Sequence, residues 1–366
     1  MSFRTAVIGA VYKTLIKPLA FRFDPEDTHD QFTRVGVILS RYAPTRFSTR
    51  LMFGYRHPML RQTIKGITFE NPVGLSAGFD KDGLLVDIIP DVGFGFEEVG
   101  SVTGERCEGN PRPRLWRVPE QQSIRVWYGL KNDGCEAIAA RLAGRHHRIP
   151  LGVSVAKTNC AATVPIKAGI ADYVKAFRTM EPVADYITIN ISCPNAFGGQ
   201  PFTTPQRLEL LLRATDKIPT GKPVFIKLSP VISMTGIDAL VAVAKKHNVQ
   251  GFVCTNLTKK GQDKGGLSGK AVEEASRQLL ARVYRQTRGS HVLISVGGIF
   301  TAEDAYDRIK HGASLVQLIT GMIYEGPQAV CAINQGLVRL LKRDGHKNIK
   351  DAVGVAFRQT PPSSGS

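Results

Sequence analysis

Short apolar runs alternate with longer amphipathic stretches along most of the chain after about residue 66. The apolar runs are nearly continuous and rich in β-branched residues, a pattern typical of parallel strands that are buried on both faces. We expect strands at residues 73–78, 96–102, 151–157, 186–192, 224–229, 251–256, 292–298 and 315–320. Stretches with helical periodicity, such as PQRLELLLRATDKI and AEDAYDRIKHG, separate many of these runs. Eight such β/α units predict an α/β protein with the TIM (β/α)8 barrel fold.

The N-terminal region shows a different pattern. Apolar residues dominate 6–21, but Lys13 and Lys17 interrupt this stretch and Pro18 follows, so it falls short of the roughly 20 apolar residues that a spanning helix requires. A secretory signal fits poorly, because the apolar run AVIGAVY is short and no small-residue cleavage site follows it. The pattern favours an amphipathic helix, and two placements remain open for it: on a membrane surface, or packed on the main domain.

These patterns divide the chain into three expected segments. Residues 1–50 form a basic helical extension, residues 51–357 form the barrel, and residues 358–366 form a disordered tail. Two stretches inside the barrel segment, 103–150 and 257–271, are too long for simple connections, and long loops after barrel strands commonly bind ligands.

The composition narrows the class of protein. With 366 residues, of which 43% are hydrophobic, the chain can bury a large core. The net charge of +17 suits nucleic acid, an anionic membrane or acidic ligands, but no RNA-binding signature with interleaved aromatic residues is present, so we expect no nucleic-acid partner. The six cysteines lie far apart without metal-ligand spacing, which favours a reducing compartment and predicts no metal site.

Candidate chemistry gathers at the ends of the predicted strands. Polar residues that packing does not explain follow or end the first, fourth, fifth and sixth strands, namely Lys81, Asn190, Cys193, Asn195, Lys227, Thr255 and Asn256. The carboxyl ends of barrel strands meet at one rim, so these side chains should lie together there. A lysine buried in the apolar run VFIKLS would need an anionic partner, whereas a lone strand lysine is more commonly a surface residue. The pairs Gly297-Gly298 and Thr320-Gly321 follow the last two strands, where barrels commonly hold a phosphate.

At the level of whole motifs, the chain resembles dihydroorotate dehydrogenases over about residues 10 to 357. The blocks NPVGLSAGFDKDG, FGFEEVGSVT, NISCPN, TNLT followed by GGLSG, ISVGGI and GASLVQLITGMIYEGP are similar to those of that family and occur in the same order. The N-terminal FDPEDTH resembles the membrane-associated, quinone-reducing class, in which a two-helix extension docks to the bilayer and forms the quinone entry.

The resemblance implies an FMN-binding barrel that oxidises a ring C–C single bond to a double bond, as in dihydroorotate to orotate, with quinone as acceptor. It assigns the flavin to Ala77, Gly78, Thr103, Lys227 and Thr255, with Ser154 where a flavin-side asparagine is usual. It assigns the flavin phosphate to Gly269, Gly297, Gly298, Thr320 and Gly321, and the small-molecule substrate to Lys81, Asn190, Asn195 and Asn256. Cys193 is the implied base, and Lys227 would stabilise the anionic reduced flavin. The resemblance of the N-terminal segment to the quinone-reducing class also implies that the protein lies on the cytoplasmic side of a membrane as a peripheral protein.

Several positions depart from the family pattern. Cys193 stands where the quinone-reducing class normally has serine; a thiol is easier to deprotonate than a hydroxyl, and a small buried residue is the alternative interpretation. Four further positions differ from the family pattern. Val126 stands where an asparagine is usual, and Leu130 where a phenylalanine is usual. Leu257 replaces a small hydroxyl residue, and Ile319 replaces a tyrosine. Valine cannot hydrogen-bond through its side chain, so part of the implied substrate-binding site differs from that of the family.

Three hypotheses therefore remain open from the sequence. The first is oxidation of dihydroorotate, and the second is a divergent paralog that desaturates another small cyclic or carboxylated substrate. The third is a flavin-binding, membrane-associated module without turnover, against which the joint presence of Lys81, Cys193 and Lys227 argues.

Overall fold

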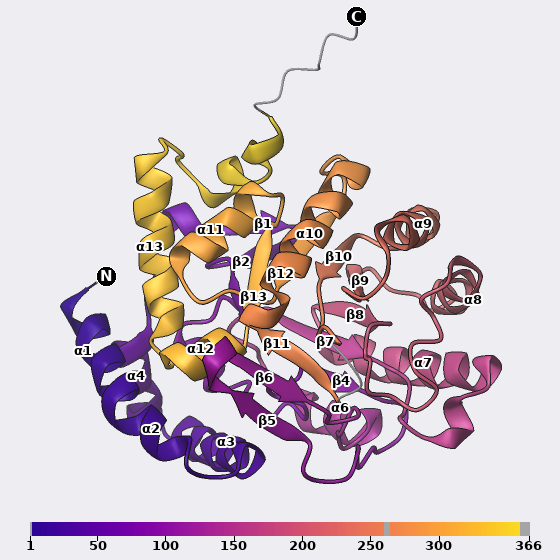
Figure 1. The fold of residues 1–366 in the computed structure, drawn as a ribbon, viewed down its shortest axis with the longest axis horizontal. Coiled ribbons are helices and arrows are strands. Elements are labelled where there is room, and N and C mark those ends of the chain that lie inside the picture. Colours follow the sequence, from indigo (N-terminus) through magenta and orange to yellow (C-terminus); the bar gives the residue numbers. More distant parts are fainter. Residues whose placement is uncertain (1, 260–263, 359–366) are drawn as a thin grey trace, which may run out of the picture.

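Eight parallel strands form a closed barrel, and each lies within one of the eight expected apolar runs. The structure, a computed structural model, describes residues 2–259 and 264–358. The barrel strands are β3 (Val73–Leu75), β4 (Phe96–Val102), β7 (Leu151–Val155), β8 (Tyr186–Asn190), β9 (Val224–Leu228), β10 (Gly251–Cys254), β12 (Val292–Val296) and β13 (Leu315–Leu318). Their order around the barrel is β10-β12-β13-β3-β4-β7-β8-β9, so strands that are consecutive in the chain are neighbours and β13 closes on β3 (Figure 1). The TIM barrel prediction is confirmed.

Helices pack around the outside of this barrel. They are α5 (Ile89–Val92), α6 (Cys135–Leu142), α7 (Ile166–Met180), α8 (Pro205–Thr215), α9 (Met234–Ala244), α10 (Glu273–Thr287), α11 (Ala302–Lys310), α12 (Thr320–Glu325) and α13 (Ala329–Arg343). Short 3-10 turns span Pro58–Leu60, Pro119–Gln121, Ala161–Thr163, Glu181–Val183, Lys270–Val272, Ile349–Ala352 and Val355–Phe357. Thr301 and Asp304 form a capping box at the start of α11, which explains why the AEDAYDRIKHG helix begins there.

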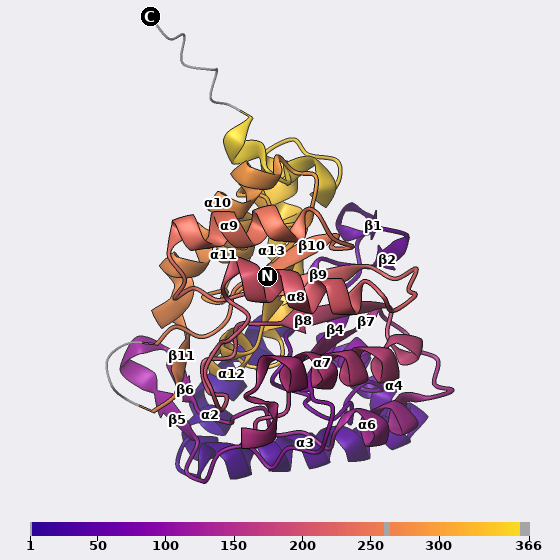
Figure 2. The same ribbon diagram turned by 90° about the vertical axis from the view of Figure 1, so that its right-hand side faces the viewer.

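Different structures cover the two ends of the barrel. The hairpin of β1 (Gln62–Ile64) and β2 (Ile67–Phe69) lies at the amino end, where the Phe69 and Phe96 rings meet edge to face at 5.4 Å. At the opposite end, β5 (Leu115–Val118), β6 (Ser123–Val126) and β11 (Gly266–Gly269) form a separate antiparallel sheet (Figure 2). The two long excursions of the sequence are therefore halves of one sheet, because β11 pairs with β6.

The N-terminal extension lies at the same end of the barrel as this sheet (Figure 2). It consists of α1 (Phe3–Val11), a π-helical turn (Tyr12–Ile16), α2 (Lys17–Ala20), α3 (Pro25–Arg41) and α4 (Ala43–Phe53). The buried carboxylate of Glu26 at the start of α3 accepts a hydrogen bond from Arg114 Nη2 at 2.8 Å, which ties the extension to the loop before β5. Within residues 2–259 and 264–358, no helix combines the length and apolarity needed to cross a membrane.

The expected helix at 6–21 is present as α1, the π-helical turn and α2 in succession. The expected boundary after residue 50 falls inside α4, and the division into segments stays a prediction. Of the expected tail, residues 359–366 lie outside the described residues.

Candidate active site

A cavity of about 500 Å³ lies between the N-terminal helices and the carboxyl end of the barrel. From the barrel side it is lined by the polar residues predicted to meet there, namely Lys81, Asn190, Cys193, Asn195, Lys227 and Asn256. From the other side α3, α4 and α5 contribute mainly apolar side chains, among them Phe32, Val35, Leu39, Phe53, Ile89 and Val92. The structure thus joins the predicted chemistry to the extension in one space.

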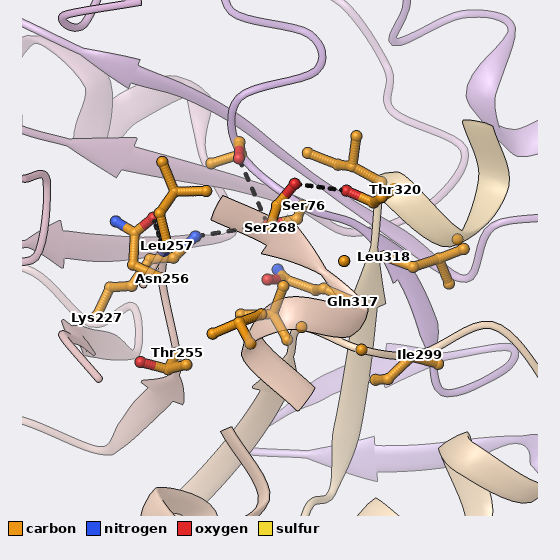
Figure 3. A pocket seen from close by; sticks show the side chains of 18 residues that line it. Ser76, Lys227, Thr255, Asn256, Leu257, Ser268, Ile299, Gln317, Leu318 and Thr320 are labelled. Carbon is orange, nitrogen blue, oxygen red and sulfur yellow. Dashed lines mark hydrogen bonds between the residues drawn. The ribbon is translucent and has the colours of Figure 1, made fainter. Parts of the chain in front are cut away.

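A smaller cavity of about 90 Å³ adjoins the first, and the two share lining residues. The shared residues are Ala77, Lys227, Asn256, Leu257, Ser268, Ile319 and Thr320. The remaining wall includes Thr255, Gly269, Gly297, Gly298 and Gly321. Figure 3 shows Lys227, Thr255 and Asn256 on one side of this cavity and Thr320 on the other, where the Ser268 and Thr320 hydroxyls lie 2.8 Å apart.

The glycines of this wall are there because no side chain fits. A Cβ on Gly298 would lie 2.4 Å from Glu273 Cβ, and one on Gly321 would lie 2.1 Å from the Ile299 carbonyl oxygen. Among the described residues, the N–H groups of Gly297 and Gly298 donate to no protein acceptor. Free backbone N–H groups in a tight glycine turn are a typical phosphate cradle, so the residues fit the phosphate of a bound cofactor.

Lys227 lies where the two cavities meet. It is 4% exposed, and its Nζ reaches Ser76 Oγ at 3.5 Å, while no carboxylate of the described residues forms an ion pair with it. Burial lowers the pKa of Lys227, an effect that the charges of Glu98 and Cys193 oppose. A buried ammonium group in this position suits an electron-rich ring. Together with the cradle, the site fits a flat cofactor with a phosphate arm.

Cys193 follows β8 on a loop at the cavity wall and is partly buried. Burial raises the pKa of its thiol to about 11, although the Asn195 backbone N–H and the charges of Lys157 and Lys227 favour the thiolate. The neutral thiol is therefore the resting form near pH 7, and it can act as a base only through its thiolate.

Hydrogen bonds fix the three predicted asparagines. The Asn190 amide donates to Ser101 Oγ at 2.8 Å, Asn195 donates to the Val126 carbonyl at 2.8 Å, and Asn256 donates to Ser192 Oγ at 2.8 Å. These bonds orient the amides at the cavity wall before any ligand arrives. Val126 therefore takes part through its backbone even though its side chain cannot.

Lys81 contacts the N-terminal extension directly. Its Nζ lies 3.3 Å from Nε2 of His29 on α3 and 4.2 Å from the centre of the Tyr128 ring. Burial lowers the pKa of Lys81 to about 8, and burial together with the charge of Lys81 lowers the pKa of His29 to about 3. The neutral imidazole can thus accept a hydrogen bond from the Lys81 ammonium group. Lys81 therefore remains cationic below about pH 8 and can pair with a carboxylate.

Two predicted residues do not line either cavity. Thr103 is fully buried, where its hydroxyl donates to the Glu105 carbonyl at 2.6 Å. Ser154 is also fully buried, and its hydroxyl lies 2.7 Å from that of Ser101. Ser101 itself lines the large cavity, so at the end of β4 it is Ser101, two residues before Thr103, that faces the site.

The sequence interpretation missed several lining residues, chiefly Ser76, Ser101, Ser268 and His29. Ser268 lies inside the quoted GGLSG block, so a signal was present for it. Ser76, Ser101 and His29 lie inside the quoted blocks NPVGLSAGFDKDG, FGFEEVGSVT and FDPEDTH, but their places at the cavity wall depend on how distant segments dock. From the sequence, Trp127, Tyr128 and Lys131 beside Val126 are candidates for a remodelled pocket wall, with loop packing as the alternative, and Tyr128 and Lys131 do line the large cavity. The departing residues Val126, Leu130, Leu257 and Ile319 all line the large cavity, together with Ala77 and Gly78.

Comparisons with known proteins agree with this geometry. Residues 59–341 match the family described as dihydroorotate dehydrogenase. A protein of Gloeobacter violaceus named dihydroorotate dehydrogenase (quinone) is 38% identical over 353 residues, covering 94% of this chain and 98% of that protein. One of Mycobacterium marinum with the same name is 38% identical over 361 residues, covering 95% and 99%.

A similar solved structure is the ligand-free type DHODH of Eimeria tenella. It has a TM-score of 0.81 and 28% identity, and the match covers 92% of this chain and 100% of that one. By the match of most of its length and by these relatives, the chain belongs to the dihydroorotate dehydrogenase family.

Proposed function

We propose that this protein oxidises dihydroorotate to orotate with FMN as cofactor and a quinone as electron acceptor. The observation that supports this most strongly is the grouping of the required residues around two adjoining cavities. Two adjoining cavities that share Lys227 bring together a glycine cradle, a buried lysine, a thiol with three amides, and an apolar wall built by the N-terminal helices.

The cofactor assignment rests on the cradle and on Lys227. Gly269, Gly297, Gly298 and Gly321, with Thr320, would hold the phosphate, while Ala77, Gly78, Ser101, Lys227 and Thr255 would face the ring. When bound, FMN supplies a hydride acceptor. Lys227 would place its positive charge beside the ring that gains the electrons, and burial of this ammonium strengthens that interaction.

The chain's own residues bind the substrate and move the proton. Lys81 would pair with the substrate carboxylate, and Asn190, Asn195 and Asn256 would orient the ring through their fixed amides. The Cys193 thiolate would remove the proton from one ring carbon while hydride leaves the adjacent carbon, so that the C–C bond becomes double. The proton on Cys193 then returns to solvent. The quinone would then accept the two electrons with two protons, one carried by the hydride and one taken from solvent.

The acceptor side uses the N-terminal helices. Their apolar side chains line the large cavity, and Lys227 lines the same cavity. An apolar wall of this kind suits a quinone ring. The outward apolar residues of α1 to α4 and the basic residues among them suit peripheral attachment to the cytoplasmic side of an anionic membrane.

The test is anaerobic mixing of the purified holoprotein with dihydroorotate, followed by the loss of visible flavin absorbance. We expect prompt bleaching in the wild type. In Cys193→Ala we expect FMN to stay bound and bleaching to slow by at least about a hundredfold, because general-base catalysis of this kind contributes 10²–10⁴-fold. Near-normal bleaching in Cys193→Ala would remove the base assignment.

A second candidate has its own observation. Val126, Leu130 and Leu257 line the same cavity as the proposed substrate residues. Such a wall favours a less polar ring than dihydroorotate, in a paralog that desaturates another small cyclic or carboxylated compound. Bleaching by other dihydro compounds and not by dihydroorotate would support it. Bleaching by none would instead support a flavin-binding module without turnover.

A further inference from the structure

Arg308 is a buried cation behind the glycine cradle. It lies on α11, it is 2% exposed, and it is one of the largest fully buried side chains of the described structure. No carboxylate of the described residues forms an ion pair with it, and its Nη1 is buried without a hydrogen-bond partner. A buried guanidinium group without an anion is costly, so it calls for a negative charge nearby.

The hydrogen bonds of Arg308 join two segments of the cradle. Nη2 donates to the Glu273 carbonyl at 2.8 Å and to the Gly297 carbonyl at 3.3 Å. Gly297 follows β12, and Glu273 begins α10 directly after Val272. Gly297 and Val272 both line the small cavity. Arg308 itself does not line that cavity, so it acts on the cavity from behind.

This arrangement has a consequence for the backbone N–H groups. In a planar trans peptide the carbonyl and the N–H point in opposite directions. Arg308 holds the Gly297 carbonyl on its own side, and the N–H of Gly298 in the same peptide therefore points away from Arg308. The Gly298 N–H has no protein acceptor among the described residues, and Gly298 lines the small cavity. The positive charge of Arg308 also strengthens the attraction of this peptide for an anion.

Neighbouring charges do not neutralise Arg308. The Glu273 carboxylate pairs with Lys270 at 2.9 Å, and Asp304 lies 3.5 Å from the same ammonium group. Asp307 and Arg277 are the other charged groups whose fields reach Arg308, and Arg277 is itself paired with Glu274 at 2.9 Å. Glu273 and Asp304 are thus engaged by Lys270, and Asp307 forms no ion pair with Arg308, so no acidic side chain of the described residues pairs with the guanidinium group.

We propose that Arg308 is a positioning residue that gives this site its preference for a phosphorylated flavin over the unphosphorylated one. It would fix the Gly297-Gly298 peptide and supply positive charge for the phosphate without touching it. The proposal rests on the proposed flavin function and adds the residue that selects the phosphate.

The test measures the dissociation constants of FMN and of riboflavin for the apoprotein, for instance by quenching of flavin fluorescence. In Arg308→Met we expect the affinity for FMN to fall about tenfold or more, because the positive charge behind the phosphate cradle is lost. The affinity for riboflavin, which has no phosphate, should change less than about threefold. Arg277→Met removes one positive charge from the same region, and it should leave both constants near the wild-type values. Arg308→Lys keeps the charge and should restore most of the preference for FMN.

Three outcomes would overturn the proposal. One is an equal loss of FMN and riboflavin affinity in Arg308→Met, which would mean that Arg308 only supports packing. Another is an unchanged FMN affinity. If Arg308→Met does not fold, the test uses Arg308→Gln, because this variant keeps a hydrogen-bond donor and removes the charge. The third outcome is an undiminished preference for FMN over riboflavin in Arg308→Gln. A wild-type apoprotein that binds neither flavin would instead remove the proposed function itself.

Discussion

At the scale of the single residue, the state of Cys193 depends on a lysine outside the cavity. Burial raises the pKa of the Cys193 thiol to about 11, and Lys157 is one of two cations that counteract this. Lys157 is 3% exposed, and its Nζ donates to the Phe197 carbonyl at 2.9 Å, in the loop that carries Cys193. Lys157 therefore both restrains this loop and favours the thiolate.

Replacing Lys157 with methionine should reduce the thiolate fraction of Cys193. The rate of Cys193 alkylation by iodoacetamide at pH 9 is proportional to that fraction, and each unit by which the pKa rises lowers the rate about tenfold. We expect a three- to tenfold lower rate in Lys157→Met, read from the Cys193 peptide by mass spectrometry. Lys167→Met, on the exposed side of α7, is the control. Faster alkylation in Lys157→Met would show that restraint of the loop, and not charge, is the main effect.

At the scale of elements, α8 and the end of α9 are joined by a histidine between two carboxylates. His247 Nδ1 lies 2.6 Å from Asp216 Oδ2, and His247 Nε2 lies 2.9 Å from Glu209 Oε2. Burial acts to lower the pKa of His247, but the hydrogen bonds to Glu209 and Asp216 outweigh it, so the pKa is raised. The folded state thus binds a proton more tightly than the unfolded state does.

The resulting stabilisation should depend on pH. It is fully present below the unfolded histidine pKa of about 6.5 and is lost as the pH rises through the higher folded value. We expect His247→Gln to lower the midpoint of urea unfolding clearly at pH 6 and much less at pH 9. The exposed His146→Gln should shift neither midpoint. An equal shift at both pH values would mean that His247 contributes through packing alone.

Elements also show what the sequence could and could not predict. The eight barrel strands follow from local apolar runs, because a strand buried on both faces needs them. The pairing of β11 with β6 could not be predicted, since it joins residues far apart in the chain that carry no matching pattern. At the end of β4 the register with β7 shifts between Gly100 and Val102. The alternation of side chains along the strand therefore no longer predicts which residue faces the site. Ser101 lines the large cavity in place of Thr103.

At the scale of the whole molecule, the same limit applies to the meeting of extension and barrel. Basic and apolar residues in the first 50 positions indicate a surface helix, but nothing local indicates that His29 contacts Lys81 or that Arg114 buries Glu26. Similarly, Arg308 has the pattern of a polar helix residue and is nevertheless fully buried. Interactions of this kind depend on tertiary docking, and they connect the parts of the site.

The outward face of α1, the π-helical turn and α2 allows a test of the membrane role. Leu15 and Leu19 are 66% and 58% exposed, and neither lines the large cavity. Burying such side chains in a bilayer interface is worth about 1.5–3 kcal/mol each, whereas a glutamate there opposes binding to an anionic surface. The double variant Leu15→Glu, Leu19→Glu should therefore bind phosphatidylglycerol vesicles at least about tenfold more weakly in a sedimentation assay.

A matched control and a second readout separate this role from folding. Leu210→Glu, Val231→Glu changes two residues that are 51% and 49% exposed elsewhere on the barrel, and it should bind vesicles as the wild type does. Anaerobic flavin reduction should be equal in all three proteins, because the proposed substrate residues are unchanged. Turnover with a long-chain quinone in vesicles should fall only in the N-terminal variant, since its acceptor must be reached from the bilayer. Unchanged vesicle binding in that variant would contradict a membrane role for this face. In that case the quinone would have to enter the large cavity from solution and not from the bilayer.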